Sequence, residues 1–241
     1  RAGYPGITEY LESNRAFIGG LNAKVTAVWA EEQKQADCIA QAARIDTATT
    51  SLEEFLPAVD AVILARDDWR ERNQLLPPLL ESGKPLFVDK PFGADEQSVN
   101  LLKQLREQKL PVMTCSSFRF SRESAAGRQA LTQLGETRAV FGAGKKDLYK
   151  YGIHLIEGLA AILPAFQVRQ VRCEGGNGRY LVHLMMSDDL PVTLLLDEAL
   201  SPAFHLTLYG SKDWKTVEYK DWFAMFRSTI EAFLRAIVDP P

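Results

Sequence analysis

The stretch GKPLFVDKPFG, residues 83–93, decides how the first half of this chain folds. It follows a helical pattern, crosses the apolar residues 86–88 and emerges as Asp89-Lys90-Pro91. A lysine at the C-terminal end of a buried parallel strand lies where open α/β sheets bind their ligands. Pro91 lacks a backbone donor and biases Lys90 toward extended backbone, so strand pairing stops there and the lysine side chain keeps one direction. Two interpretations of Lys90 remain open: a site residue, or a solvated lysine at a strand exit.

Around this stretch, strand and helix patterns alternate. Strands are expected at 24–30, 47–49, 59–65, 86–88 and 111–115, and helices at 4–17, 33–43, from Ser51 onward, 68–82 and 94–108. The run VDAVILA at 59–65 is almost continuously apolar, as in a strand covered on both faces. Pro77-Pro78 predicts a kink or break in the helix at 68–82. The alternation predicts a Rossmann-like domain with a parallel sheet over residues 1–116.

The pattern changes after Ser116, where strands begin to follow one another. Strands are expected at 137–142, 167–173, 179–186, 192–197, 205–209 and 216–219, and helices at 123–134, 153–163 and 222–237. Turn signals such as Gly175-Gly176-Asn177-Gly178 separate the strands. Residues 117–241 are therefore predicted to form an α+β domain, an antiparallel meander with helices on one face. Its last helix could pack back on the first domain.

Composition excludes several classes of protein. The chain has 241 residues, 46% of them hydrophobic and 24% charged, with a net charge of −3, so it lacks the basic surface of a nucleic-acid-binding protein. Its apolar runs are too short to span a bilayer. Cys38, Cys115 and Cys173 are odd in number and lack metal-type spacing, which favours buried thiols in a reducing compartment, the cytoplasm. No metal site is expected. Both ends of the sequence look cut, since it begins at Arg1 and stops directly after a helix.

A second stretch, KYGIHLIE at residues 150–157, supports the interpretation of Lys90 as a site residue. With VDAVILA at 59–65, the Asp-Lys-Pro stretch and Gly152-Ile153-His154, the chain resembles the Gfo/Idh/MocA family, the glucose–fructose oxidoreductase and inositol dehydrogenase group. The resemblance runs from about residue 24 to residue 237. It implies an NAD- or NADP-dependent oxidoreductase that oxidises a hydroxyl of a sugar, inositol or related polyol. It also implies a homodimer or homotetramer that pairs through the open face of the second sheet.

The resemblance implies roles for two side chains. His154 would be the general base that takes the hydroxyl proton, because imidazole titrates near neutral pH. Lys90 would hydrogen-bond the same oxygen and stabilise its developing negative charge. The alternative for His154 is a histidine near a helix start that only packs and caps. His183 and His205 lie in alternating strands and are interpreted as structural.

Lys150 departs from the family pattern, which places an aspartate there. A second cation near Lys90 and His154 would lower both pKa values unless an acid, Asp147 or Glu157, offsets it. Lys150 would suit an anionic substrate such as a sugar acid or a carboxylate-bearing ring, or it could point to solvent. Tyr151, Glu157 and Arg119 are further substrate-binding candidates from the same region. Arg119 could pair with a substrate carboxylate or form an interdomain salt bridge.

The larger departure concerns the cofactor site. A dinucleotide site needs a first strand and a Gly-x-Gly-x-x-Gly turn, and neither lies before Lys24; Gly3 and Gly6 have the wrong spacing. Without its first strand, a parallel sheet exposes a central edge. Glu31 fits the acid that binds ribose hydroxyls, which favours NAD over NADP, or it is a solvated charge.

The remaining cofactor-binding candidates are Ala65, Arg66, Trp69, Asp89 and Lys90. Trp69 could stack on the cofactor or simply pack. The missing turn and Lys150 keep a rival open: a non-catalytic relative that binds a ligand or partner without hydride transfer.

Overall fold

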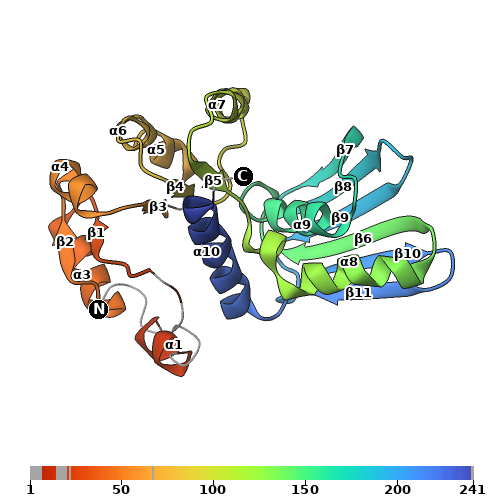
Figure 1. The fold of residues 1–241 in the computed structure, drawn as a ribbon. Helices are drawn as coiled ribbons and strands as arrows, with labels where there is room; N and C mark the ends of the chain where they lie inside the picture. Colours follow the sequence, from red (N-terminus) through yellow and green to blue (C-terminus); the bar gives the residue numbers. More distant parts are fainter. Residues whose placement is uncertain (1–6, 15–20, 22, 67, 240–241) are drawn as a thin grey trace.

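The structure is a computed structural model, and it describes residues 7–14, 21, 23–66 and 68–239. Figure 1 shows a first half of short strands and helices and a second half built on one large sheet. The helix expected at 4–17 is described as α1 (Ile7–Ser13). Gly3 and Gly6 lie outside the described residues.

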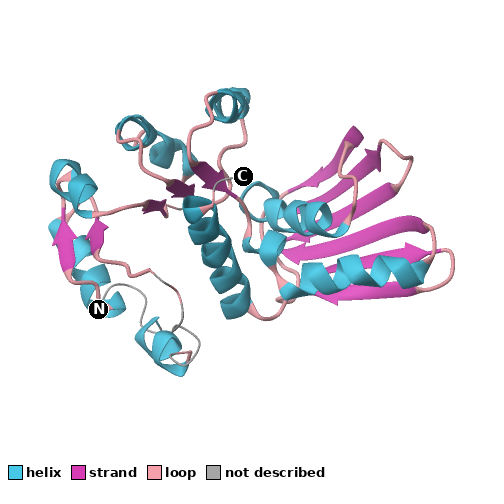
Figure 2. Ribbon diagram, viewed as in Figure 1, coloured by secondary structure: helices cyan, strands magenta, loops and turns pink. Residues whose placement is uncertain are grey.

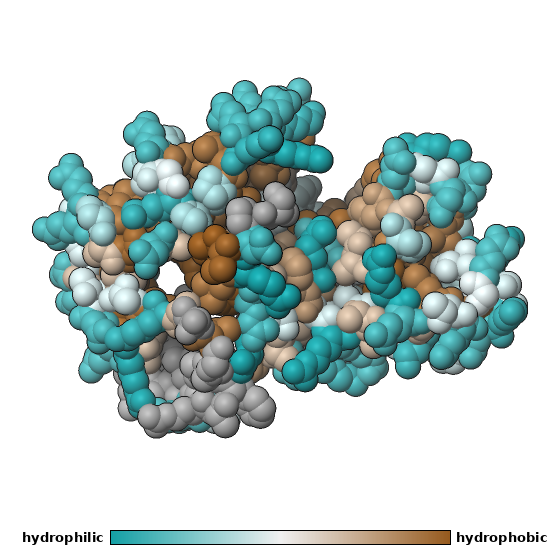
Figure 3. All heavy atoms as spheres, in the orientation of Figure 1, coloured by the Kyte–Doolittle hydropathy of each residue, from teal (hydrophilic) through white to brown (hydrophobic). Residues whose placement is uncertain are grey.

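The first half contains five three-residue strands: β1 (Ala27–Trp29), β2 (Thr47–Thr49), β3 (Val62–Leu64), β4 (Leu86–Val88) and β5 (Val112–Thr114). All their pairings are parallel, as predicted, but they form two sheets, β1-β2 and β3-β4-β5. Among the described strands, β1 pairs only with β2 and β3 only with β4, so the parallel strands form two separate sheets. The space-filling view has an opening in this region, between the β1 side and helix α10 (Figure 3).

The helices of this half reflect local signals. They are α3 (Gln33–Ala43), α4 (Leu52–Phe55), α5 (Trp69–Asn73), α6 (Leu76–Glu81) and α7 (Glu96–Glu107). Helix α3 packs on the β1-β2 sheet rather than on the β3-β4-β5 sheet (Figure 1). Ser51 caps α4 by accepting from the Glu54 amide at 3.2 Å. The helix expected at 68–82 is broken, as predicted, but before Pro77-Pro78 and not at them. The prolines lie in the first turn of α6, where a missing amide costs no helical hydrogen bond.

The second half is organised on a six-stranded sheet with the order β11-β10-β6-β9-β8-β7. Its strands are β6 (Thr137–Lys145), β7 (Val168–Gly176), β8 (Arg179–Met186), β9 (Pro191–Asp197), β10 (Phe204–Gly210) and β11 (Trp214–Glu218). All pairings are antiparallel except β6 with β9. The predicted simple meander is therefore wrong at one point: β10 does not pair with β9 but lies beyond β6, so the two consecutive strands enclose an earlier one.

Helices α8 (Arg122–Leu134) and α9 (Leu148–Ile162) lie on one face of this sheet, as Figure 2 shows. Leu155, Leu159 and Ile162 of α9 are fully buried against strands β6, β9 and β10. The expected start of this helix at residue 153 is wrong. It begins five residues earlier, because Asp147 accepts from the Lys150 amide at 2.8 Å and caps the first turn. Lys150 and Tyr151 therefore belong to the helix.

Helix α10 (Trp222–Val238) returns to the first half of the chain (Figure 1). Phe233 packs with Phe87 of β4 at a ring-centroid separation of 5.7 Å, in a cluster that includes Cys115. This contact ties the C-terminal helix to the strand that ends at Lys90. No helix in the described part of the chain is long and apolar enough to cross a membrane.

Candidate active site

Lys90 is held by the backbone around it and by a buried arginine. It follows β4, and the preceding Asp89 amide donates to the Leu64 carbonyl at 3.0 Å. Arg72 of α5 has no exposed surface, and its guanidinium donates to the carbonyls of Asp89, Pro91 and Phe92. The Lys90–Pro91 peptide between these carbonyls is cis. Because Arg72 forms hydrogen bonds with the backbone on both sides of Lys90, the backbone position of the lysine is fixed.

His154 lies in the second turn of α9 and is 6% exposed. Its Nδ1 is 2.7 Å from the Oγ of Ser116, a fully buried serine that follows β5. Burial, followed by the positive charges of Lys90 and Lys146, lowers the pKa of His154 to about 3. The imidazole is therefore neutral near neutral pH, and with Nδ1 on Ser116 its Nε2 is the nitrogen left for a ligand.

Tyr151 brings the two predicted catalytic residues together. The Lys90 Nζ lies 4.9 Å from the Tyr151 ring centroid, and the Tyr151 and His154 ring centroids are 5.6 Å apart. Lys90 and His154, which are 64 positions apart in the sequence, therefore both lie beside the Tyr151 ring. A hydrogen-bond donor and a neutral imidazole at one centre can stabilise an alkoxide and exchange its proton.

A pocket of about 420 Å³ opens beside His154. It is lined by Lys145, Lys146, Tyr151, His154, Pro202, Ala203, Phe204, Tyr219, Lys220 and Trp222. Lys146 donates to the Tyr151 hydroxyl at 2.8 Å, and its Nζ is 4.3 Å from the ring centroid. The second cation beside His154 is therefore Lys146. Lys150, which the sequence singled out, is half-buried and is not among the residues that line this pocket.

Two other substrate-binding candidates bind each other. The Arg119 Nε donates to the Glu157 carboxylate, and Glu157 is 8% exposed. This ion pair joins the segment after β5 to α9 and occupies the carboxylate that was expected to offset a cation near His154. The substrate role of both residues remains a prediction.

The cofactor-binding candidates fall at the C-terminal ends of the parallel strands. Glu31 follows β1, Ala65 and Arg66 follow β3, and Asp89 and Lys90 follow β4. The Arg66 Nη1 is 2.7 Å from a Glu31 carboxylate oxygen, which links the two parallel sheets. This edge fits a dinucleotide in part. Glu31 could bind ribose hydroxyls, and Lys90 lies near His154. In the described ranges, however, no glycine-rich turn follows a strand.

Trp69 begins α5 and is 9% exposed, with the Arg70 guanidinium 4.4 Å from its ring centroid. Such burial favours the packing role over stacking on a cofactor. His183 lies on β8 with its Nδ1 3.1 Å from the Thr193 hydroxyl, which suits the structural role that the sequence predicted.

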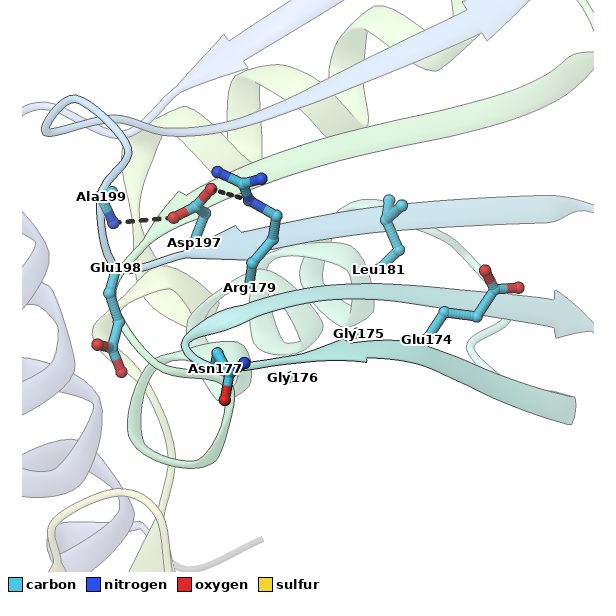
Figure 4. A pocket seen from close by; sticks show the side chains of 9 residues that line it. All are labelled: Glu174, Gly175, Gly176, Asn177, Arg179, Leu181, Asp197, Glu198 and Ala199. Atoms are coloured by element: carbon cyan, nitrogen blue, oxygen red, sulfur yellow. Dashed lines mark hydrogen bonds and ion pairs between the residues drawn. The ribbon is translucent and has the colours of Figure 1, made fainter.

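A larger pocket, about 670 Å³, lies at the β7-β8 hairpin (Figure 4). Figure 4 shows Arg179 and the Ala199 amide directed at the Asp197 carboxylate, at 2.6 and 2.8 Å. Its lining contains no histidine, cysteine, serine or lysine, and three of its charged residues, Glu174, Arg179 and Asp197, are in ion pairs. Its lining offers fewer groups for proton transfer than the pocket beside His154.

Sequence reasoning missed four residues of the centre: Arg72, Lys146, Phe204 and Trp222. Lys146 lies in the pair Lys145-Lys146 just before the capping Asp147, which was a readable signal. Ser116 follows β5, but nothing local in the sequence indicates that it binds His154.

Comparison with known families agrees with this geometry. The model described as "Oxidoreductase family, NAD-binding Rossmann fold", Gfo/Idh/MocA, matches residues 1–115. The match covers just under half of the chain, and the family it describes is one of NAD-binding oxidoreductases. It supports an NAD(P)-dependent dehydrogenase. No curated protein has a significantly matching sequence.

Solved structures of Gfo/Idh/MocA type share the fold over nearly the whole chain. A putative myo-inositol dehydrogenase from Sinorhizobium meliloti 1021 is 18% identical, with a TM-score of 0.81 over 100% of this chain and 88% of that one. A myo-inositol dehydrogenase from Corynebacterium glutamicum is 14% identical, with a TM-score of 0.78 over 99% and 86%. GenD2 from gentamicin A biosynthesis, in complex with NAD, is 14% identical, with a TM-score of 0.79 over 100% and 86%. At these identities the likeness concerns the fold alone.

Proposed function

We propose that this protein transfers hydride between a hydroxyl-bearing carbon of a sugar, inositol or related polyol and a nicotinamide cofactor, with Lys90 and His154 as the catalytic residues. The observation that carries the proposal is their meeting around Tyr151, at the exit of β4 and beside an open pocket. The inositol dehydrogenases among the structural neighbours support the substrate class.

The chain's own residues account for the proton. In the oxidation direction, the substrate O–H bond breaks and its proton goes to His154 Nε2, while the Lys90 ammonium donates a hydrogen bond to the same oxygen. For Nε2 to accept, Nδ1 must carry a proton and donate it to Ser116 Oγ. The hydride that leaves the carbon is accepted by the nicotinamide ring when the cofactor is bound.

Glu31 supports NAD as the preferred cofactor, because a carboxylate accepts hydrogen bonds from ribose hydroxyls and repels a 2′-phosphate. Its ion pair with Arg66 places a cation beside it, so Arg66 would lie against the same ribose. The three cysteines are all free thiols, which supports a reducing compartment such as the cytoplasm.

One observation favours the rival, a relative that binds without catalysis. A histidine with a pKa of about 3 is a weak base, and the cations Lys90 and Lys146 help to keep it so. An activity assay separates the dehydrogenase from the non-catalytic relative. The full-length protein is mixed with NAD or NADP and with myo-inositol, scyllo-inositol or D-glucose, and reduction of the cofactor is followed by absorbance. Turnover with any of these supports the dehydrogenase; no turnover, with cofactor binding retained in calorimetry, supports the rival.

A further inference from the structure

The pocket beside His154 is positively charged, although the whole chain has a net charge of −3. Three lysines line it, and no carboxylate does. Of the neighbouring acids, Asp147 caps α9 and Asp197 binds Arg179. Glu218 pairs with Lys220 and offsets its charge, which leaves Lys145 and Lys146 as the cations of the pocket. A charge of one sign in a cleft concentrates ligands of the opposite sign.

Lys146 is held at this pocket in an unusual backbone conformation. Its φ is 86°, in the region that favours glycine, and its amide donates to the Asp197 carbonyl at 3.2 Å. A non-glycine residue is strained in this region, and such strain concentrates at functional sites. The side chain is also fixed, because Nζ binds the Tyr151 hydroxyl and lies over its ring.

The pocket lining also contains apolar residues: Pro202, Ala203, Phe204 and Trp222. Phe204 and Trp222 lie edge to face at 5.8 Å, and Phe204 is in turn 5.7 Å from His154. Aromatic faces pack well against the C–H face of a sugar or cyclitol ring, while ammonium groups bind carboxylate or phosphate oxygens. The pocket therefore combines a surface for a ring with a surface for a negative charge.

We propose that Lys146, assisted by Lys145, binds an anionic group of the substrate, a carboxylate or a phosphate, carried on a polyol ring. The proposal rests on the proposed function, since it places this group beside the carbon that reacts near His154. Selectivity for anions is thus assigned to Lys146, which lines the pocket, whereas the sequence analysis assigned it to Lys150.

The test is calorimetric binding of D-glucuronate, D-glucose 6-phosphate and D-glucose to the full-length protein. The variants are Lys146→Gln and Lys150→Gln. Lys109→Gln is the matched control, because Lys109 is also an exposed lysine at positive φ, 54°, and is not part of the pocket. Lys146→Gly is a second test variant, which relieves the backbone strain and is expected to keep or raise the melting temperature.

The wild type should bind at least one of the two anionic sugars at least about tenfold more tightly than D-glucose. Lys146→Gln and Lys146→Gly should remove that preference, and Lys109→Gln should leave it. Tighter binding of the glucuronate identifies a carboxylate, and tighter binding of the sugar phosphate identifies a phosphate.

Equal or immeasurable affinity for the anionic and neutral sugars would overturn the proposal, and so would a preference that is lost in Lys150→Gln but kept in Lys146→Gln. Because the measurement needs no turnover, it is distinguishable from failure of the dehydrogenase function. If anion binding depends on Lys146 but NAD or NADP is not reduced, the proposed dehydrogenase function is wrong and the anion-binding site at Lys146 still holds.

Discussion

Ser116 Oγ lies 2.7 Å from His154 Nδ1, and both residues are buried. Ser116 also accepts from the Phe118 amide at 3.2 Å, so its hydroxyl is fixed by the turn that follows β5. This contact joins the last strand of the Rossmann-like half to α9 of the second half. It leaves Nε2 as the imidazole nitrogen for a ligand, so the proposed proton chemistry would depend on both halves of the chain.

Ser116→Ala should lower kcat by about tenfold to a hundredfold while KM changes little, because the imidazole loses the partner that fixes its tautomer. The measurement is steady-state kinetics on whichever polyol is turned over. Ser117→Ala is the matched control: Ser117 is also buried, but its hydroxyl has no partner among the described residues. Equal effects of the two changes would show that the Ser116 contact does not position His154.

Arg72→Met should destabilise the fold by about 2–4 kcal/mol, because it leaves the carbonyls of Asp89, Pro91 and Phe92 without their donor. It should also reduce kcat, since Lys90 lies between those carbonyls. Urea unfolding gives the stability. Arg70→Met on the exposed side of the same helix is the control and should change stability by less than about 1 kcal/mol. A stable Arg72→Met protein with full activity contradicts the positioning role.

The proposed catalytic pair could be singled out from the sequence because its signals are local. Lys90 lies in an Asp-Lys-Pro strand exit, and His154 in a Gly-x-His helix segment. Their surroundings could not be predicted, because they come from distant segments: Ser116 is 38 residues from His154, and Arg72 is 17 residues from Asp89. Side-chain pairing at such distances is decided by tertiary packing.

The fold shows the same limit. Alternation of strands and helices predicted parallel pairing, but the division between β1 and β3 depends on which strands lie side by side. The predicted meander failed for a similar reason. Turn signals separate β9 from β10, yet they do not say that β10 packs beyond β6.

Acid should destabilise the protein through His154. Its pKa is 6.5 in an exposed model group and about 3 in the folded protein. Between these values the unfolded chain binds a proton that the folded protein excludes, so stability falls as the pH drops below 6.5. Above pH 6.5 the imidazole is neutral in both states and contributes nothing. Between pH 7 and pH 5 the loss should be about 2 kcal/mol.

Urea unfolding of the wild type and His154→Gln at these two pH values checks this prediction. The wild type should lose more stability on acidification than the variant, because the other titrating groups are common to both. Parallel losses would mean that His154 keeps an ordinary pKa in the folded protein.

The open face of the six-stranded sheet should mediate self-association. Phe141, Tyr209 and Trp214 are 51%, 42% and 60% exposed and contact one another across β6, β10 and β11. Exposed aromatic clusters of this kind are typical of protein interfaces. We expect a homodimer or homotetramer in light scattering, converted to smaller species by Phe141→Ser with Trp214→Ser.

Phe226→Ser is the control for this prediction, because Phe226 is 57% exposed on α10, away from the sheet. A wild type that is monomeric at micromolar concentration refutes the interface, as does a double variant that keeps the wild-type mass.

The most direct test of the central claim is the rate of NAD or NADP reduction by the wild type, Lys90→Ala, His154→Ala and the double variant, with cofactor binding measured on the same samples. If Lys90 and His154 act on one oxygen, each single change should lower kcat by about a hundredfold or more, with the fold and cofactor affinity kept. The double variant should be little slower than the worse single one, because the two groups act as a unit. A double variant that retains wild-type turnover would contradict the account.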